Sequence, residues 1–391
     1  MSIDEKEVHT TCAFSPERQA KAMCELKEKT LAGLFEPITF RGVTVRNRIG
    51  VSPMCQYNSV DGMANDWHLV HLGSRAVGGA GLVMTEATAI SPEGRITPDD
   101  LGIWQDEHIE PLVRVVRFVK SYGAVPGIQL AHAGRKASTA NPWKSKLGRH
   151  IKVDLSDEEG GWQPVAPSPL KFQENSRVPH ELTIDEIRAV QSKFADGARR
   201  AVEAGFSLVE LHAAHGYLCH NFYSPLTNHR TDAFGGSFEN RVRFVIETLE
   251  VIRKAIPDHM PLGIRLSCTD WVEGGWSLDD SIKLAKILKG MDVSFIDCSS
   301  GYGVSHARYP HGPGWQVPLS DGIRNQACIP TAAVGEITTP EQAADIISSG
   351  KADLVFLARE FMREPYWPYK AARTLQLKDM ETLPRIYSYA T

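Results

Sequence analysis

Eight short apolar segments, separated by stretches with helical periodicity, constrain the fold of this chain more than any other feature. Each is rich in branched side chains and apolar on both faces, as in a parallel sheet covered by helices. Eight such units favour an α/β fold with a closed (β/α)₈ barrel over an open doubly wound sheet. A Rossmann fold should show G-x-G-x-x-G after a strand, and none of these segments is followed by it. The predicted strands are 49–53, 82–86, 125–130, 208–211, 262–266, 295–298, 331–334 and 354–357.

The intervening stretches carry recognisable helix signals. Thr183 precedes a helical stretch with Glu186 three residues on, which is a capping box, and Thr339 precedes Pro340 at a first helical position. The sequence predicts helices over 109–122, 184–204, 241–255, 278–291 and 340–349. Glycines at 79, 123, 205 and 350 lie between a helix and the next strand, where a left-handed cap is needed.

Two regions depart from the alternating pattern. Residues 1–33 lack strand signals and are predicted to be a partly helical N-terminal extension, with a helix over 16–29, ahead of a barrel domain over 34–391. The connection 129–183 is long and aperiodic, which predicts a lid-like loop after the third strand. A second irregular stretch, 301–318, follows the sixth strand at the same end of the barrel.

Composition excludes several classes of protein. A formal net charge of −4 does not favour a nucleic-acid surface, which needs a basic excess. No stretch approaches the roughly 18 consecutive apolar residues of a membrane span. The seven cysteines are scattered without a C-x-x-C pair, so neither a disulfide framework nor an iron–sulfur cluster is indicated. The polar first residues lack a signal-peptide pattern, and the chain is expected to be cytoplasmic.

In a barrel, the residues that follow the strands converge on one mouth, where active sites lie. Here they are mostly hydrogen-bond donors and include few carboxylates, which suits an anionic or electron-rich ligand better than a divalent cation. They are Met54, Cys55, Tyr57, Ala87, Thr88, Gln129, His132, His212, His215, Tyr217, Arg265, Gly335 and Arg359.

His212 and His215 are the sharpest local feature. They could bind zinc, but no third ligand with suitable spacing appears, so no metal site is predicted. With Tyr217 they could instead be paired donors for a carbonyl oxygen beside a phenol of pKa near 10 that acts as proton donor. Two unrelated polar loop residues remain the alternative. His68 and His71 have the same spacing, but on a predicted helix, and a structural role is favoured for them.

Other mouth residues have two interpretations each. Arg359 with Gly335 could bind phosphate, as barrels do near the last two strands, or Arg359 could form a rim salt bridge. Cys55 alone would usually be a core thiol. Gln129 and Arg265 alone would be interior polar residues that pair with each other.

Several motifs together resemble the Old Yellow Enzyme family, from about residue 34 to the end of the chain. Cysteine at 55 followed by glutamine and tyrosine resembles its thermophilic-like, xenobiotic-reductase branch. The motifs are Ser52-Pro53-Met54-Cys55-Gln56-Tyr57, Glu86-Ala87-Thr88-Ala89, Gln129-Leu130-Ala131-His132-Ala133-Gly134-Arg135, Glu210-Leu211-His212-Ala213-Ala214-His215-Gly216-Tyr217-Leu218, and Arg230-Thr231-Asp232 through Gly235-Gly236-Ser237 to Asn240-Arg241.

The resemblance implies an FMN-dependent ene-reductase that uses NADPH or NADH. In that family the reduced flavin passes hydride from N5 to the β-carbon of an α,β-unsaturated carbonyl or nitro compound. By resemblance, His212 and His215 bind the activating oxygen and Tyr217 protonates the α-carbon. Tyr57 adds a hydrogen bond to the substrate, and Cys55 tunes the redox potential of the flavin.

The same resemblance implies the cofactor contacts and the assembly. Ser52, Pro53, Met54, Cys55, Ala87 and Gln129 would contact the flavin. Arg265 would place positive charge near N1, and Gly335, Ala358 and Arg359 would hold the phosphate, with Ala358 where family members often have glycine. A homodimer or homotetramer that acts on small activated alkenes is expected, without nucleic acid or membrane partners.

Three alternatives stay open. A flavin-binding barrel without alkene turnover would not need Tyr217 as a proton donor. A non-flavin lyase or aldolase would need a Schiff-base lysine, and no lysine lies at a predicted strand end. Flavin barrels related to dienoyl-CoA reductases and amine dehydrogenases carry a cysteine-rich cluster after the barrel, which this sequence lacks.

Overall fold

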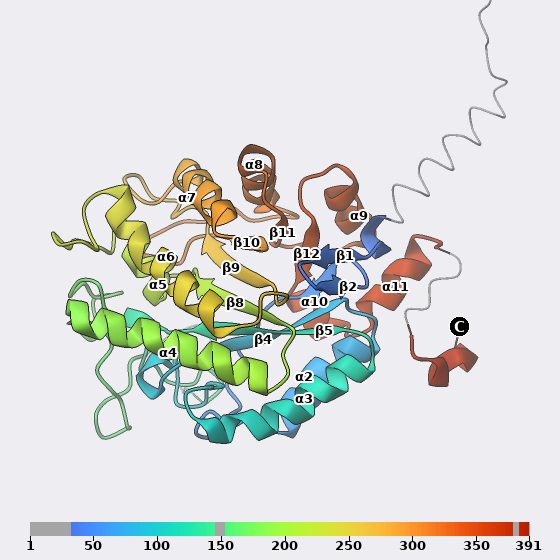
Figure 1. Cartoon of the computed structure of the whole chain (residues 1–391), viewed down its shortest axis with the longest axis horizontal. Helices are drawn as coiled ribbons and strands as arrows, with labels where there is room; N and C mark the ends of the chain where they lie inside the picture. Colours follow the sequence, from blue (N-terminus) through green and yellow to red (C-terminus); the bar gives the residue numbers. More distant parts are fainter. Residues whose placement is uncertain (1–32, 145–152, 378–382, 391) are drawn as a thin grey trace, which may run out of the picture.

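Eight parallel strands close into a barrel in the computed structural model, which describes residues 33–144, 153–377 and 383–390. The strand order around the barrel is β10-β11-β12-β3-β4-β5-β8-β9, and Figure 1 shows these strands surrounded by helices. Each of the eight predicted segments begins at the same residue as one of them, so the predicted (β/α)₈ barrel is confirmed. The strands are β3 (Ile49–Val51), β4 (Leu82–Ala89), β5 (Val125–Ala131), β8 (Leu208–Ala213), β9 (Leu262–Ser267), β10 (Phe295–Ser299), β11 (Thr331–Ala333) and β12 (Leu354–Leu357).

Five strands extend further toward the mouth than predicted, and β4 and β8 do so by two or more residues. β4 continues to Ala89, and its register with β5 shifts between Met84 and Ala87. Ala87 and Thr88 therefore lie inside a strand rather than after it. β8 continues to Ala213, so His212 is also a strand residue. In both cases pairing with a neighbouring strand, β5 for β4 and β9 for β8, continues through residues that the sequence alone assigns to a loop.

The five predicted helices are confirmed within three residues at each end. They are α3 (Ile109–Ser121), α4 (Ile184–Glu203), α6 (Phe238–Ala255), α7 (Leu278–Gly290) and α9 (Pro340–Ser348). Thr183 caps α4 by accepting a hydrogen bond from the Glu186 amide, and the Glu186 carboxylate accepts one from the Thr183 amide. Thr339 caps α9 ahead of Pro340, as predicted. The four glycines between helix and strand all have positive φ, from 68° to 102°.

The described chain also contains helices outside that predicted set. His68 and His71 lie on α2 (Asp66–Val77), as expected. α8 (Val317–Ala327) begins where the second irregular stretch was predicted to end. Its sequence carries Pro318 and Gly322, which weaken a helical pattern, and it ends at a left-handed Cys328 instead of a glycine. Three short helices are α5 (Leu218–Tyr223), α10 (Arg359–Arg363) and α11 (Trp367–Thr374).

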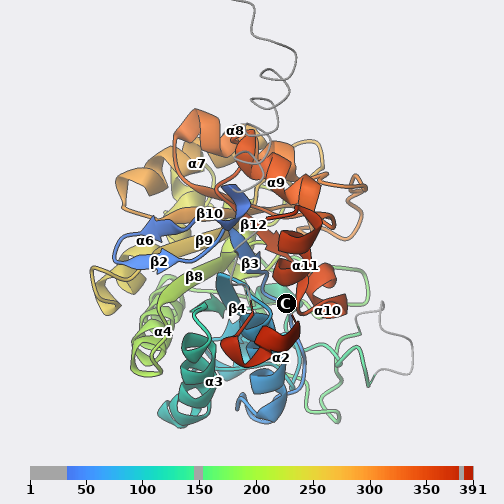
Figure 2. The same cartoon turned by 90° about the vertical axis from the view of Figure 1, so that its right-hand side faces the viewer.

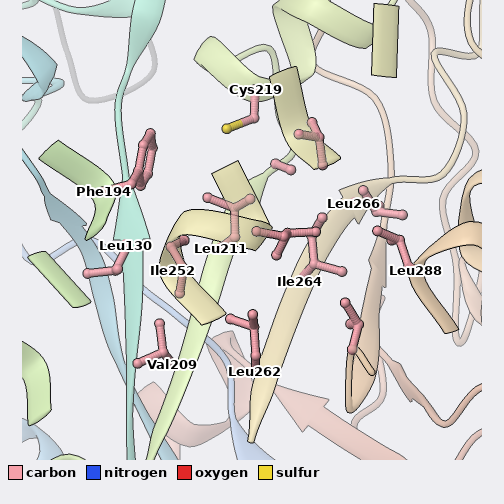
Figure 3. Packing of buried hydrophobic residues seen from close by; sticks show 14 of the residues in the cluster. Leu130, Phe194, Val209, Leu211, Cys219, Ile252, Leu262, Ile264, Leu266 and Leu288 are labelled. Carbon is pink, nitrogen blue, oxygen red and sulfur yellow. The ribbon is translucent and has the colours of Figure 1, made fainter. Parts of the chain in front are cut away.

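The main core lies between the barrel strands and the outer helices. Phe194 of α4, Ile252 of α6 and Leu288 of α7 are fully buried against the outward-facing side chains of β5, β8 and β9 (Figure 3). The outward faces of these strands are apolar because they meet the helices, whereas their inward faces carry Gln129, Glu210 and Arg265 inside the barrel. The core thereby fixes the strand ends that carry the mouth residues.

A two-stranded hairpin covers the opposite end of the barrel. β1 (Ile38–Phe40) pairs antiparallel with β2 (Val43–Val45), and Figure 2 shows β2 beside the barrel strands. The Phe40 ring lies 5.4 Å from the Phe295 ring, and both belong to a buried apolar cluster with Leu82, Leu208 and Leu354. Because these are first residues of their strands, the hairpin closes the barrel at the end away from the mouth.

The long connection after β5 lies partly over the mouth. Its described portions contain the 3-10 helix η4 (Gly134–Lys136) and the short strands β6 (Val165–Ala166) and β7 (His180–Glu181). Trp162 from this connection packs against a small cluster that includes Tyr217. Residues 145–152, and all of the predicted 1–33 extension except Gly33, lie outside the described residues. Within the described part, no helix is long and apolar enough to span a membrane.

Candidate active site

The predicted trio of His212, His215 and Tyr217 meets at the carboxyl end of β8. The ring centres of His212 and His215 are 5.3 Å apart, and those of His212 and Tyr217 are 5.1 Å apart. Both pairs are nearly perpendicular. The structure therefore gathers two imidazoles and a phenol into one group.

Backbone contacts fix how the two imidazoles are presented. The amide of Ala214 donates to His212 Nδ1 at 3.2 Å, which leaves the proton of a neutral His212 on Nε2. His215 Nε2 lies 2.7 Å from Ser299 Oγ. The His215 amide donates to Ser267 Oγ at 2.8 Å. Neither serine was predicted, because each lies on another strand and meets His215 only through the barrel register.

The site keeps both histidines neutral. Burial lowers the pKa of His212 and of His215 well below the ordinary value, and the nearby charge of Arg265 lowers both further. Lys136 contributes in the same direction. Its ammonium donates to the carbonyl of His215 at 2.7 Å and lies 5.1 Å from the centre of the Tyr217 ring. Sequence reasoning missed Lys136, which follows β5 in η4.

Tyr217 holds its proton more tightly than expected. Burial raises its pKa well above the usual 10, with further contributions from Cys55 and Asp100, whereas the sequence suggested a phenol near that value. Burial also raises the pKa of Tyr57. The difference arises because Tyr217 is buried, whereas a residue in a loop after a strand is usually exposed to water. Tyr217 is therefore protonated at neutral pH and able to donate its proton.

Cys55 and Tyr57 join the same group from the segment after β3. Both are partly buried and pack against a cluster formed by Ile96, Ala133, Ala137 and Tyr217. Ala87 and Tyr217 line one small cavity of about 10 Å³. Tyr217 thus contacts the same cluster as Cys55 and Tyr57 and shares a cavity with Ala87.

The barrel interior below the trio is polar, and its pairing differs from the simple alternative. Gln129 Nε2 donates to Glu210 Oε1 at 2.7 Å. Arg265 Nη1 donates to Ser52 Oγ at 3.2 Å, and its Nε lies 3.1 Å from Asp297 Oδ2. Gln129 and Arg265 therefore each bind a carboxyl residue instead of each other.

The two buried carboxyls correct the expectation that carboxylates are scarce here. Burial raises the pKa of Glu210 to about 8, with a further contribution from Asp297, against the influence of Arg265 and Gln129. Burial raises the pKa of Asp297 to about 6, while Arg265 opposes that shift. Glu210 is thus largely protonated at neutral pH. A signal for it was available, because Glu210 precedes His212 by two residues and points to the same face of its strand.

The predicted phosphate residues line a cavity of about 440 Å³. Gly335, Ala358 and Arg359 all contribute to its wall. Gly335 has φ of 116°, and a Cβ there would lie 2.9 Å from Gln316 Nε2, so glycine is required for its backbone to line this space. Arg359 is exposed, with Nη2 3.7 Å from Glu336 Oε1, so it both forms the rim ion pair and faces the cavity.

The remaining histidines have local roles. His132 is buried and accepts a hydrogen bond from the Gly134 amide through Nδ1, and burial lowers its pKa to about 4. His68 Nε2 lies 3.3 Å from Glu86 Oε1 on the inner side of α2. The described residues contain no group of three or more His, Cys, Asp or Glu side chains arranged to hold a metal ion.

This donor set fits a flavin mononucleotide. The amide of Gln129 and the guanidinium of Arg265 are buried donors in the barrel interior, suited to the polar edge of an isoalloxazine ring. The cavity lined by Gly335 and Arg359 supplies close backbone approach and positive charge for a phosphate. Ser52, which accepts a hydrogen bond from Arg265, and Met54 are buried, and Pro53 is partly exposed.

Comparison with known proteins gives the same family as the residues. The sequence profile of the NADH:flavin oxidoreductase / NADH oxidase family matches residues 33–378. An NADPH dehydrogenase of Geobacillus sp. (strain WCH70) is 46% identical over 344 residues, which cover 88% of this chain and 94% of that protein.

Two solved structures extend the likeness to the fold. The Old Yellow Enzyme homologue from Zymomonas mobilis is 28% identical, with a TM-score of 0.73 over 88% of this chain and 93% of that chain. Morphinone reductase in complex with tetrahydroNAD is 27% identical, with a TM-score of 0.72 over 88% of this chain and 91% of that chain. The chain therefore belongs to the NADH:flavin oxidoreductase / NADH oxidase family, to which the Old Yellow Enzymes belong.

Proposed function

We propose that this protein is an FMN-dependent NAD(P)H oxidoreductase that reduces the C=C bond of α,β-unsaturated carbonyl or nitro compounds. The observation that carries the proposal is the group of His212, His215 and Tyr217, in which the rings of a second neutral imidazole and a protonated phenol lie 5.3 Å and 5.1 Å from the His212 ring. Relatives named NADPH dehydrogenase, and a related structure that holds a nicotinamide analogue, support NAD(P)H as the reductant.

The chain's own residues would hold the cofactor at two places. Gln129 and Arg265 would bind the polar edge of the ring, with Ser52, Pro53, Met54 and Ala87 beside it. Gly335, Ala358 and Arg359 would hold the phosphate. Bound FMN, reduced by NAD(P)H, would supply the hydride for the β-carbon of the substrate.

The two histidines would bind the oxygen that activates the alkene. A neutral imidazole that carries its proton on Nε2, as His212 does, can donate to a carbonyl or nitro oxygen. As hydride reaches the β-carbon, negative charge develops on that oxygen, and donors already aimed at it lower the barrier. Because both histidines are held neutral by burial and by Arg265, the site presents donors without extra positive charge that would need a counter-ion.

Tyr217 would complete the reaction by giving its proton to the α-carbon. Its raised pKa keeps the proton in place until an enolate forms, and an enolate carbon is basic enough to take it. Lys136, 5.1 Å from the ring centre, would stabilise the phenolate left behind. Tyr57 would add a hydrogen bond to the substrate, and Cys55 would lie beside the flavin ring and tune its redox potential.

A spectral experiment tests both half-reactions. The purified protein should show a flavin spectrum that bleaches when NADPH is added without oxygen and returns when 2-cyclohexenone is added. Tyr217→Phe should bleach at the same rate but recover about 10²- to 10⁴-fold more slowly, the usual range for a lost general acid. Tyr122→Phe, at the opposite end of the barrel near the start of β5, is the matched control.

Three outcomes would contradict the proposal. A protein that does not take up FMN would refute the cofactor assignment. Bleaching without recovery in the wild type would leave a flavin-binding barrel without alkene turnover. Equal recovery in Tyr217→Phe and the wild type would remove Tyr217 as the proton donor. The expected homodimer or homotetramer is tested separately by light scattering.

A further inference from the structure

The turn that carries His215 and Tyr217 has an unfavourable backbone conformation. His215 has φ of 58° and Gly216 has φ of 70°, two consecutive left-handed residues of which only one is glycine. Residues other than glycine avoid this region unless their surroundings impose it. Something in the structure must therefore hold the turn, and the position of both side chains depends on it.

The Gly216 peptide is held on both sides by α5. Its N–H donates to His220 Nδ1 at 2.8 Å, and its carbonyl accepts from Asn221 Nδ2 at 3.0 Å. His220 and Asn221 are both fully buried. The first turn of α5 thus holds the peptide groups on both sides of Gly216, one next to His215 and one next to Tyr217.

His220 is itself paired with a buried carboxylate. Its Nε2 lies 2.8 Å from Asp270 Oδ1, and neither side chain is exposed. Asp270 also accepts hydrogen bonds from Ser224 Oγ at 2.6 Å and from the Trp276 amide at 2.8 Å. Burial opposes ionisation of Asp270, but the interactions with His220, Ser224 and Trp276 outweigh it and lower its pKa.

These contacts determine the tautomer of His220. An N–H donor at 2.8 Å from Nδ1 requires that Nδ1 carry no proton, so the proton is on Nε2 and is donated to Asp270. A carboxylate can only accept, so Asp270 enforces this arrangement. A buried imidazole without such a partner could place its proton on either nitrogen.

We propose that His220 and Asp270 are positioning residues for the proposed reaction. Asp270 fixes the His220 tautomer, His220 accepts the Gly216 amide, and that bond holds the left-handed turn that aims Tyr217 and His215. Asp270 lies beyond the end of β9, whereas the turn follows β8, so the pair also ties two mouth loops together. The inference depends on the proposed function, because the roles of Tyr217 and His215 do.

Asp270→Asn tests the tautomer without changing the size of the side chain. An asparagine amide can donate to His220 Nε2, which moves the imidazole proton to Nδ1. Two N–H donors, Nδ1 and the Gly216 amide, would then face each other, and the hydrogen bond between them would be lost. A misplaced reacting group typically costs about 10²-fold. We therefore expect flavin recovery with 2-cyclohexenone to slow about 10- to 100-fold, while bleaching by NADPH changes less than about 3-fold.

Two substitutions at His220 separate its two bonds. In His220→Asn the side-chain oxygen lies near the place of Nδ1 and can accept from Gly216. In His220→Gln the longer side chain reaches Asp270 but leaves the Gly216 amide without its acceptor. We expect His220→Asn to recover faster than His220→Gln by about 10-fold. Ser224→Ala, which removes one Asp270 bond without affecting the tautomer, is the control and should resemble the wild type.

Each outcome supports or overturns the inference. Slow recovery with normal bleaching in Asp270→Asn, and partial rescue in His220→Asn, support it. Equal slowing of bleaching and recovery, together with a lower melting temperature, would show that the pair only stabilises the fold. Recovery at the wild-type rate in Asp270→Asn would also overturn it. If Tyr217→Phe itself recovers normally, the proposed function fails, and that result is read independently of Asp270.

Discussion

Replacing Glu210 with glutamine tests whether a neutral carboxyl group lies inside the barrel. Glu210 is fully buried, and its Oε1 accepts a hydrogen bond from Gln129 at 2.7 Å. Glutamine has the same shape and can accept the same bond, so Glu210→Gln mimics the protonated acid. The variant removes the titration and little else.

The expected effect depends on pH, and its sign follows from the direction of the pKa shift. Glu210 has a pKa of about 8 in the folded state and 4.5 as an ordinary carboxyl, because burial opposes its ionisation. Between these values the unfolded chain releases the proton and the folded protein keeps it, so the free energy of unfolding falls as pH rises. At 1.36 kcal/mol per pH unit, the loss is at most about 5 kcal/mol by pH 8.

Urea unfolding at pH 5, 6, 7 and 8 measures this difference. Wild type and Glu210→Gln should unfold at similar urea concentrations near pH 5, and the variant should become the more resistant protein as pH rises. Glu250→Gln, on the exposed side of α6, controls for the loss of a formal negative charge. A constant difference between wild type and Glu210→Gln over this range would refute the assignment of a protonated Glu210.

Three further predictions concern the site and the core. His212→Ala should weaken binding of a phenol such as p-hydroxybenzaldehyde about 10- to 100-fold in a visible titration, since a hydrogen bond to a charged oxygen contributes about 1.5–3 kcal/mol; an unchanged Kd would contradict the oxyanion assignment. Gly335→Ala should release FMN about 10-fold more readily on dilution, because its Cβ would lie 2.9 Å from Gln316. Gly236→Ala, with φ of 80° and no atom within 4 Å of its Cβ, should carry the backbone strain without the flavin loss. Phe194→Ala should lower the free energy of unfolding by about 3–5 kcal/mol in urea, and a loss below 1 kcal/mol would contradict its place in the core.

The barrel could be predicted because its signals are local. Strands buried on both faces read as continuous apolar runs, and capping residues such as Thr183 mark helix starts directly. α8 was not predicted because the residue that follows it, Cys328, adopts the left-handed conformation of a helix end without being glycine. Ala87 and His212 were placed just beyond strands that in fact include them, since strand ends depend on pairing with neighbours.

The mouth residues could be predicted from their place after strands, but their partners could not. Arg265 meets Asp297 because β9 and β10 pair in the register that sets these two residues side by side. Gln129 meets Glu210 for the same reason on β5 and β8. The register between neighbouring strands is a property of the closed barrel. The individual segments therefore predict the donors Gln129 and Arg265 but not their carboxyl partners Glu210 and Asp297.

The hairpin of β1 and β2 closes one end of the barrel, so the interior is accessible only from the mouth. Its Phe40 and Val45 pack into the apolar cluster at the start of the strands, so water has no direct route from that side to Glu210 or Asp297. We therefore expect protons that exchange with these two groups to pass through the mouth. A ligand in the mouth then controls how fast the interior equilibrates with solvent. We expect Glu210 and Asp297 to keep the protonation state that they had at the pH at which the ligand bound, for as long as the ligand stays in the mouth.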